Sequence, residues 1–341
     1  MDEQRKYELV INVQICKFLN HNFELLTLNF LRLIRWPNLL IIAATMYMLR
    51  YFIMLPLLDS YGLNPQMKDL DFFLLILATV LLAAAGYIVN DLYDVNTDKI
   101  NKPTKIIIGK LIGLRFAENL HLLLNLVAII IGIYISYSIG IRSVSLAFLV
   151  VAGLLYFYST TYKSQLIVGN LMVSFFAALV PLMVLLFELP LLKTKYRIFE
   201  NSGFNLNFLV IWFVIYASFA FLISFAREIV KDIQDIKGDS ANAIRTLPVV
   251  YGIKISKFIV LILLAAIVAL IFYILIRFIH DPISLTYILP FILTPVIYTG
   301  WIVYKASGIK DYEKASLFCK ITMLTGMLYS IIVKFVLLNV L

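Results

Sequence analysis

The sequence predicts an all-α, polytopic membrane protein built as a bundle of nine transmembrane helices. Two observations of composition lead to this prediction: 62% of the 341 residues are hydrophobic and only 14% are charged, whereas charged residues make up about 25% of an average soluble domain. The third is that the apolar residues form blocks long enough to cross roughly 30 Å of hydrocarbon at about 1.5 Å per helical residue. This composition excludes a secreted disulfide-stabilised domain, a nucleic-acid-binding module and a disordered chain.

Nine blocks of the sequence account for the predicted spans. The first, 39–58, contains one charged residue, Arg50. The next seven contain no Asp, Glu, Lys or Arg: 72–89, 120–141, 144–162, 166–187, 208–226, 258–276 and 283–304. The ninth, 318–340, carries Lys320 and Lys334 near its ends, from where lysine side chains reach the interface. Glu188 lies just past the predicted end of the fifth span, so that no span interior is expected to contain an acidic residue.

The first 36 residues are predicted to form an amphipathic interfacial segment ahead of the transmembrane domain of residues 37–341. Residues 9–34 mix apolar side chains with Lys17, Glu24 and Arg32, a pattern typical of a helix that lies in the interface. Because charges run through this region and no compact apolar core precedes a small-residue cleavage site, no cleavable signal peptide is expected. The first span begins at Trp36-Pro37, where proline ends the preceding segment.

The distribution of basic residues predicts a cytoplasmic amino terminus. In that orientation the loops 90–119, 163–165, 227–257 and 305–317 are cytoplasmic and hold fifteen Lys and Arg residues, whereas the opposite loops hold six. Cytoplasmic loops of membrane proteins carry such an excess, which explains the net charge of +9 without a nucleic-acid partner. We therefore expect a multi-pass protein of a bacterial or archaeal inner membrane.

Two aspartate clusters with the same spacing follow the second and the sixth spans, both on the predicted cytoplasmic side. Each has Asp at positions i, i+3 and i+7: Asp91, Asp94 and Asp98 in the first, and Asp232, Asp235 and Asp239 in the second. On a helix at about 100° per residue these positions fall within roughly 60° of one another, so that each helix end presents a stripe of three carboxylates. One such stripe is typical of the polar end of a span, but two copies on the same side predict a shared site.

These stripes are electrostatically unfavourable and need a counter-charge. Like charges one helical turn apart repel, the carboxyl end of a helix disfavours negative charge, and an Asp at membrane depth costs about 2.5–3.5 kcal/mol. Divalent cations are the simplest compensation, and Mg²⁺ prefers one or two carboxylates together with water and substrate phosphates. The sequence thus predicts that the six aspartates bind Mg²⁺ as the cofactor and, with it, a diphosphate.

Basic residues beside both clusters fit a diphosphate ligand. Lys102 and Lys105 follow the first cluster, Arg227 and Lys231 flank the start of the second, and Arg245 follows it. Such side chains supply point charges or forked donors to phosphate oxygens that a metal ion leaves uncompensated. We interpret all five as candidate substrate-binding residues.

The chain resembles the UbiA superfamily of intramembrane prenyltransferases, whose architecture has nine spans. Asn90 through Asp98 resembles the NDxxDxxxD motif of that family, and Asp232 through Asp239 resembles its second aspartate-rich motif. Three further segments are similar to family segments: Arg35-Trp36-Pro37-Asn38 to an RxPN start, Tyr158 through Asn170 to a YSxxxK…GN loop, and Arg245-Thr246-Leu247-Pro248 to an RTLP segment. The resemblance covers nearly the whole chain.

Within the family, residues 227–239 are most similar to the digeranylgeranylglyceryl phosphate synthases. This resemblance implies Mg²⁺-dependent transfer of a polyprenyl group, expected to be geranylgeranyl, from its diphosphate to geranylgeranylglyceryl phosphate. The chain departs from its relatives at Lys105 and Ile106, where arginine and proline are usual, and lysine lacks the bidentate fork of arginine. An aromatic acceptor of hydroxybenzoate, naphthoate or porphyrin type is therefore the alternative.

The resemblance also implies roles for individual side chains. The prenyl tail would lie among the helices with its diphosphate at the cytoplasmic mouth, where Asn38 and Asn90 add neutral contacts. Lys163, with Lys102 and the arginine of the RTLP segment, would stabilise charge on the departing oxygens. Tyr158 is available to stabilise the allylic cation that remains.

Two other classes of function are compatible with acidic residues at a membrane: a cation-coupled transporter and a non-catalytic lipid-binding scaffold. Transporter carboxylates usually lie near the bilayer midplane on broken helices, whereas these aspartates lie at helix ends, and a scaffold does not need six of them. His21, His121 and His280 do not cluster, which argues against zinc or haem. Cys16 and Cys319 have apolar neighbours and no CxxC spacing, so that both are expected in the core, and nothing indicates a protein partner.

Overall fold

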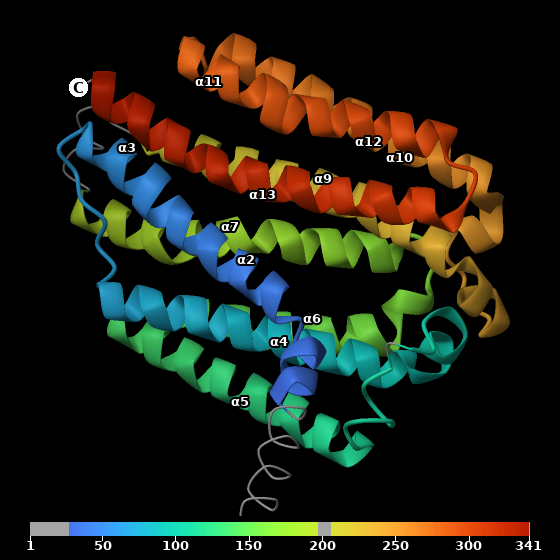
Figure 1. The fold of residues 1–341 in the computed structure, drawn as a ribbon. Helices are drawn as coiled ribbons and strands as arrows, with labels where there is room; N and C mark the ends of the chain where they lie inside the picture. The colour runs from blue at the N-terminus through green and yellow to red at the C-terminus, as the bar shows by residue number, and fades with distance from the viewer. Residues whose placement is uncertain (1–26, 105, 197–205, 341) are drawn as a thin grey trace, which may run out of the picture.

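The protein is a bundle of long helices, seen in a computed structural model that describes residues 27–104, 106–196 and 206–340 (Figure 1). Within these residues there is no β-strand, only one isolated bridge between Ile108 and Ile112. Nine helical segments of the described chain are long and apolar enough to cross a membrane, and each coincides with one of the nine predicted spans. The predicted fold class is confirmed.

The spans follow one another along the chain in the predicted order. The first combines α2 (Trp36–Met48), the π-helical turn η1 (Leu49–Met54) and α3 (Leu55–Asp59). The next five are α4 (Asp69–Asn101), α5 (Leu114–Ser138), η2 with α6 (Arg142–Val144 and Ser145–Thr160), α7 (Val168–Lys195) and α9 (Asn207–Ala241), with the short turn η3 (Tyr162–Ser164) between α6 and α7. The last three are α10 (Leu247–Arg277), α11 with η4 and α12 (Pro282–Ile288, Leu289–Leu293 and Thr294–Lys305), and α13 (Ile309–Val340).

Several helices continue beyond their apolar blocks. Both α4 and α9 extend past the predicted span ends, so that the two aspartate clusters lie on helix and not in loops. Helix α7 runs on to Lys195, which corrects one expectation: Glu188 lies inside this helix, where it is fully buried, and not past the end of the span. Most of the predicted interfacial segment, with Cys16 and His21, lies outside the described residues, although residues 27–33 are helical.

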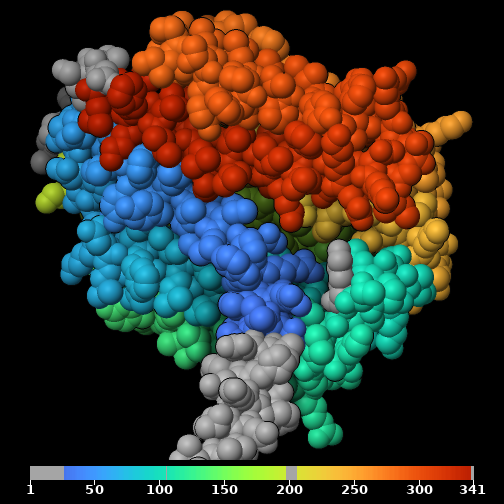
Figure 2. All heavy atoms as spheres, in the orientation of Figure 1, coloured from blue at the N-terminus to red at the C-terminus, as the bar shows by residue number. Residues whose placement is uncertain are grey.

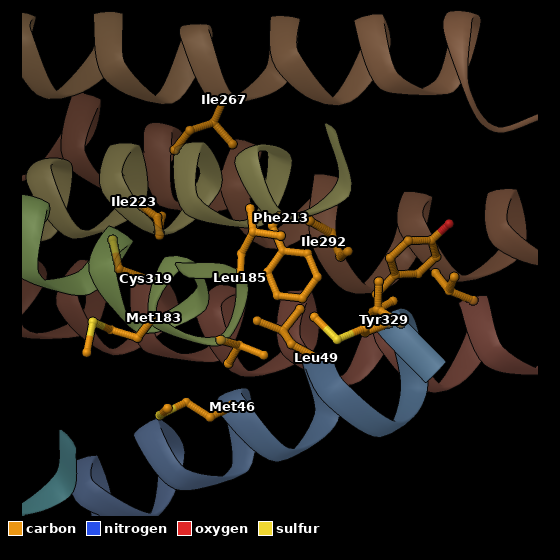
Figure 3. Packing of buried hydrophobic residues seen from close by; sticks show 14 of the residues in the cluster. Met46, Leu49, Met183, Leu185, Phe213, Ile223, Ile267, Ile292, Cys319 and Tyr329 are labelled. Atoms are coloured by element: carbon orange, nitrogen blue, oxygen red, sulfur yellow. The ribbon is translucent and has the colours of Figure 1, made fainter. Parts of the chain in front are cut away.

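The helices pack around one extended apolar core. In Figure 1, α4 and α5 lie on one side of the bundle, α10, α11 and α12 lie on the other, and α7 and α9 lie between them. Figure 3 shows core side chains from α2, α7, α9, α10 and α13 meeting in this middle region. Cys319 is fully buried there, as predicted.

The end of the bundle remote from the aspartates is closed by a buried ion pair. Arg50 Nη1 lies 2.8 Å from Glu188 Oε2, and both side chains are at most 3% exposed. Arg50 also donates to the carbonyl of Met67, whose own amide donates to Glu188 Oε1 at 3.0 Å. This network ties the first span, the loop before α4 and α7 together.

Candidate active site

The first aspartate cluster lies on the last three turns of α4 and is contacted by cations from two other segments. Arg35 Nη2 lies 2.5 Å from Asp91 Oδ1. Lys163, on the turn between α6 and α7, forms an ion pair with Asp94 and donates to Asn90 Oδ1 at 2.9 Å. Asn90 Nδ2 in turn donates to Asp94 at 2.8 Å. Predicted site residues from separate parts of the chain therefore meet here.

The second cluster lies on the last turns of α9 and has one polar partner for each carboxylate. Asn170 Nδ2 donates to Asp232 Oδ2 at 2.7 Å. Lys102 Nζ lies 2.7 Å from Asp235 Oδ2. The Thr246 hydroxyl lies 3.3 Å from Asp239 Oδ2. The partners come from α7, the end of α4 and the start of α10, so that the cluster is fixed from several sides.

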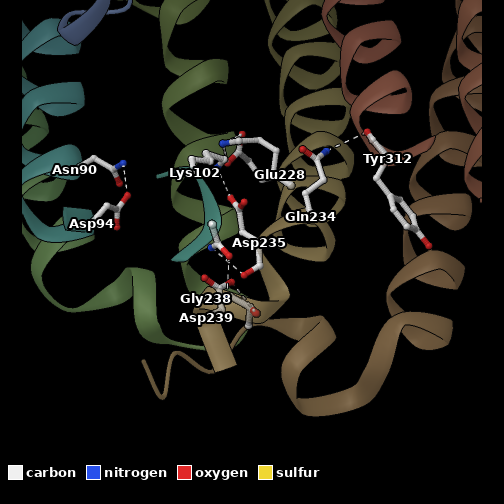
Figure 4. Close-up of polar contacts among 12 residues, drawn as sticks. Asn90, Asp94, Lys102, Glu228, Gln234, Asp235, Gly238, Asp239 and Tyr312 are labelled. Atoms are coloured by element: carbon white, nitrogen blue, oxygen red, sulfur yellow. Dashed lines mark hydrogen bonds and ion pairs between the residues drawn. The ribbon is translucent and has the colours of Figure 1, made fainter. Parts of the chain in front are cut away.

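The ends of α4 and α9 are joined directly, which brings the two clusters to one mouth. Asn101 Nδ2 donates to the carbonyl of Asp235 at 3.0 Å, and Asn101 Oδ1 accepts from the Gly238 amide at 2.8 Å (Figure 4). Asp239 of the second cluster interacts electrostatically with Asp94 of the first. Tyr158 of α6 interacts electrostatically with both Asp94 and Asp232. The predicted meeting of the two stripes is thus seen in the described structure.

Gly238 allows the close approach of α4 to α9. A Cβ atom on this residue would lie 2.4 to 2.6 Å from side-chain atoms of Asn101, so that Gly238→Ala displaces Asn101 or shifts the end of α9. We expect a loss of about tenfold or more in turnover, because small displacements at a reacting centre are costly. Turnover in reconstituted membranes measures the effect. Gly153→Ala is the control: a Cβ there meets nothing within 4 Å, and full activity of both variants would contradict this role of Gly238.

A small cavity lies beside the first cluster. Its lining includes Asp91, Val95 and Asp98 on one face of α4 and residues 106–108 after that helix. The two aspartates are separated by seven residues and therefore share a helix face. The cavity places two carboxylates of one stripe beside the same open space.

Arg35 stands at the entrance to α2 and faces the first cluster. It adopts a left-handed backbone conformation (φ 53°) just before Trp36-Pro37 begins the helix. Its guanidinium lies 4.9 Å from the ring centroid of Tyr87. Burial alone would lower the pKa of Arg35, but Asp91, Tyr87 and Asp94 together outweigh burial and raise that pKa. Arg35 is therefore a permanent cation at the site.

The donor set fits a metal ion that shares its ligands with a substrate. Among the described residues, no three His, Cys, Asp or Glu side chains converge closely enough to hold a metal ion by themselves. Mg²⁺ does not need such a cage, because it commonly takes one or two carboxylates and completes its shell with water and phosphate oxygens. Oxygen ligands on two opposed helices match this preference, and sulfur and imidazole ligands are lacking in both clusters.

Some predicted site residues are placed differently from the expectation. Arg227 and Lys231 pair with Glu228, at 2.9 and 2.8 Å, and not with the aspartates. The backbone amide of Arg245 donates to the carbonyl of Ser164 at 3.3 Å, which joins it to the Lys163 turn, but the residue is exposed. Asn38 lies in the first turn of α2. Lys105 lies outside the described residues.

Five residues of the site were not among the predicted site residues: Arg35, Asn101, Asn170, Glu228 and Thr246. Signals for four were present, since Arg35, Asn170, Glu228 and Thr246 belong to segments that carry the family resemblance. The role of Asn101 depends on which helices pack together. Carboxylates and basic residues stand out in the sequence by their charge, whereas the amide and hydroxyl side chains that hydrogen-bond to the site do not.

Comparison with known proteins identifies the family. Residues 34–324 match the sequence profile of the UbiA prenyltransferase family. The chain belongs to that family. A digeranylgeranylglyceryl phosphate synthase from Methanosphaera stadtmanae is 31% identical over 73% of this chain and 82% of its own length. The synthase of the same name from Methanobrevibacter smithii is 33% identical over 56% of this chain and 62% of its own length, which is less than two thirds of that relative.

A solved structure supports the fold assignment. The structure of a UbiA homolog from Archaeoglobus fulgidus bound to DMAPP and Mg²⁺ covers 92% of this chain and 100% of its own, with a TM-score of 0.55 and 17% sequence identity. The chain thus combines membership of the UbiA prenyltransferase family with nine helices, among its described residues, that are long and apolar enough to cross a membrane.

Proposed function

We propose that this UbiA protein transfers a geranylgeranyl group from its diphosphate to the free hydroxyl of geranylgeranylglyceryl phosphate, with release of diphosphate. The observation that carries the proposal is the joined end of α4 and α9, where carboxylates of both clusters and the cations Lys102 and Lys163 meet. The names of the relatives from Methanosphaera stadtmanae and Methanobrevibacter smithii support the glyceryl phosphate acceptor. The excess of basic residues at this end of the bundle supports a cytoplasmic site.

The metal in this proposal is Mg²⁺, bound by Asp91, Asp94 and Asp98 on α4 and by Asp232, Asp235 and Asp239 on α9. The Mg²⁺ complex of the Archaeoglobus fulgidus homolog supports this assignment. When bound, the ion supplies charge neutralisation for the leaving diphosphate. The unfavourable stripes of carboxylates are consistent with such a counter-charge, since the chain supplies each stripe with only partial compensation.

The side chains of the chain itself bind and orient the donor. Lys163 and Lys102 lie beside the carboxylates, from where their ammonium groups donate to diphosphate oxygens as negative charge builds up on them. Asn90 and Asn170 fix the carboxylates of Asp94 and Asp232. Tyr158 interacts electrostatically with Asp94 and Asp232 of the two clusters, and its aromatic ring would stabilise positive charge on the allylic carbon. Burial of the tail among apolar helices keeps water away from that carbon.

The identity of the acceptor distinguishes the proposed function from its alternative, the prenylation of an aromatic ring. Membranes containing the full chain are incubated with radiolabelled geranylgeranyl diphosphate, Mg²⁺ and one acceptor at a time: geranylgeranylglyceryl phosphate, hydroxybenzoate or a naphthoate. We expect label in a digeranylgeranylglyceryl phosphate and none in aromatic products. Label transferred only to an aromatic ring would overturn the proposed acceptor while leaving the donor and the chemistry in place.

A further inference from the structure

A second group of cations lies beside the start of the second aspartate cluster. It consists of Arg227 and Lys231 on α9 and Lys320 on α13, which we call the α9–α13 basic cluster. Arg227 Nη1 and Lys231 Nζ both contact the carboxylate of Glu228, at 2.9 and 2.8 Å. Lys320 interacts electrostatically with Arg227 and Lys231, as well as with Glu228. None of these side chains contacts the six aspartates through an ion pair in the described structure.

The packing of α9 against α13 explains why these residues meet. The two helices are antiparallel neighbours, and Gln234 Nε2 donates to the carbonyl of Tyr312 at 3.0 Å (Figure 4). Arg227 precedes Gln234 by seven residues on α9. Cys319, the neighbour of Lys320, follows Tyr312 by seven residues on α13. Two helical turns from the cytoplasmic contact, the same pair of helices therefore brings the three cations together.

The charges of this cluster do not balance. Arg227 and Lys231 pair with the single carboxylate of Glu228, and Lys320 and Arg35 interact electrostatically with the same residues, so that cations outnumber the carboxylate here. Arg227 Nε is buried and has no hydrogen-bond partner among the described residues. No carboxylate of the described chain forms an ion pair with Lys320. A buried donor without a partner and a surplus of positive charge are costly unless an anion joins them.

Access to this region is open. Figure 2 shows a hollow between α13, the start of α2 and the segment after α4, with atoms of α7 and α9 at its floor. Lys320 is an exposed residue of α13, and Arg227 and Lys231 retain 17% and 32% side-chain exposure. A lipid headgroup entering beside α13 would therefore meet the basic cluster.

We propose that the α9–α13 basic cluster binds the phosphate of the acceptor lipid, separately from the diphosphate of the donor. A phosphate monoester carries a charge of about −1.5 to −2 near neutral pH, which is opposite in sign to the surplus. Glu228 precedes Asp232 by four residues, a rise of about 6 Å along α9. In a glyceryl phosphate ether the free hydroxyl is one or two carbons from the phosphate, so that an anion held beside the start of the aspartate cluster leaves that hydroxyl near the donor. This inference rests on the proposed function, because it presupposes a phosphate-bearing acceptor.

Steady-state kinetics with both substrates varied tests the proposal. The full chain in proteoliposomes is given geranylgeranyl diphosphate and either geranylgeranylglyceryl phosphate or geranylgeranylglycerol, which lacks the phosphate. We expect Lys320→Met to raise KM for the phosphate acceptor by about 10- to 100-fold, the usual effect of losing a charged hydrogen bond, and to leave KM for the donor unchanged. Lys320→Arg should keep the low KM, and Lys310→Met, an exposed lysine on the same helix, should behave as the wild type.

Three results would overturn the assignment. An unchanged acceptor KM in Lys320→Met, with an active wild type, would contradict the phosphate subsite and leave the proposed function standing. A raised donor KM would assign the cluster to the diphosphate. A wild type that uses no glyceryl phosphate acceptor would refute the proposed function and the subsite together. If the proposal holds, the penalty for removing the phosphate from the acceptor is smaller in Lys320→Met than in the wild type by about the same 10- to 100-fold, a difference that misfolding does not produce.

Discussion

Asp91→Asn and Asp235→Asn are each expected to lower Mg²⁺-dependent release of diphosphate by about a thousandfold or more. The two residues stand on different helices, and each is in contact with a cation of the site, Arg35 or Lys102. Neutralising one carboxylate removes a proposed metal ligand and leaves its cationic partner without a counter-ion. Metal-ion stabilisation of a leaving group is worth several kcal/mol, which corresponds to about three orders of magnitude in rate. Release of diphosphate from geranylgeranyl diphosphate in proteoliposomes measures the effect.

The matched control removes an exposed carboxylate that belongs to neither aspartate cluster. Glu313→Gln changes an exposed residue near the start of α13 and should retain full activity. Membrane insertion and elution volume in size-exclusion chromatography should be the same for all three variants. If either aspartate variant kept wild-type activity at saturating Mg²⁺, a shared site of the two clusters would be refuted.

Glu188→Gln is expected to destabilise the protein by about 3–5 kcal/mol, the usual cost of leaving one member of a buried ion pair without its partner. The Arg50 guanidinium remains in an environment where only 3% of its side chain is exposed, and the amides of Gln66 and Met67 lose a charged acceptor. Chemical denaturation of the purified protein in micelles measures the change in the free energy of unfolding. Because the pair lies at the opposite end of the bundle from the aspartates, the folded fraction should keep its turnover.

Two further variants separate the ion pair from general disturbance. Arg50→Met combined with Glu188→Leu should recover most of the lost stability, since an apolar pair of similar volume often replaces a buried ion pair without loss. Asp69→Asn removes the other carboxylate near Arg50, at 3.7 Å but with 83% of its side chain exposed, and should cost about 1 kcal/mol or less. Equal effects of Glu188→Gln and Asp69→Asn would contradict a dominant role for the buried pair.

Features that depend on neighbouring residues in the sequence were predictable. Nine spans follow from apolar length alone, and the helical period places Asp91, Asp94 and Asp98 on one stripe wherever α4 ends. The predicted second and sixth spans ended before the helices do, because α4 and α9 continue as polar helix, which hydropathy does not detect. Glu188 was assigned to a position beyond the fifth span because the predicted block ended at its first charged residue, whereas α7 continues through Leu191 and Leu192.

Contacts between distant segments could not be predicted in this way. Asn170 and Asp232 are separated by 62 positions, and Arg50 and Glu188 by 138. Their pairing depends on which helix faces pack together, and one sequence contains no direct record of that packing. The positions of Arg227 and Lys231 show the same limit: their proximity to Asp232 in the sequence predicted a shared ligand, whereas both side chains point to Glu228.

The most direct test of the central claim is a structure of the full chain with Mn²⁺ in place of Mg²⁺ and a non-hydrolysable geranylgeranyl thiolodiphosphate, in which anomalous scattering locates the metal. The two-cluster account predicts metal between the ends of α4 and α9, with carboxylates of both helices and diphosphate oxygens as its ligands. Metal and diphosphate bound by one helix alone, or away from both, would contradict it.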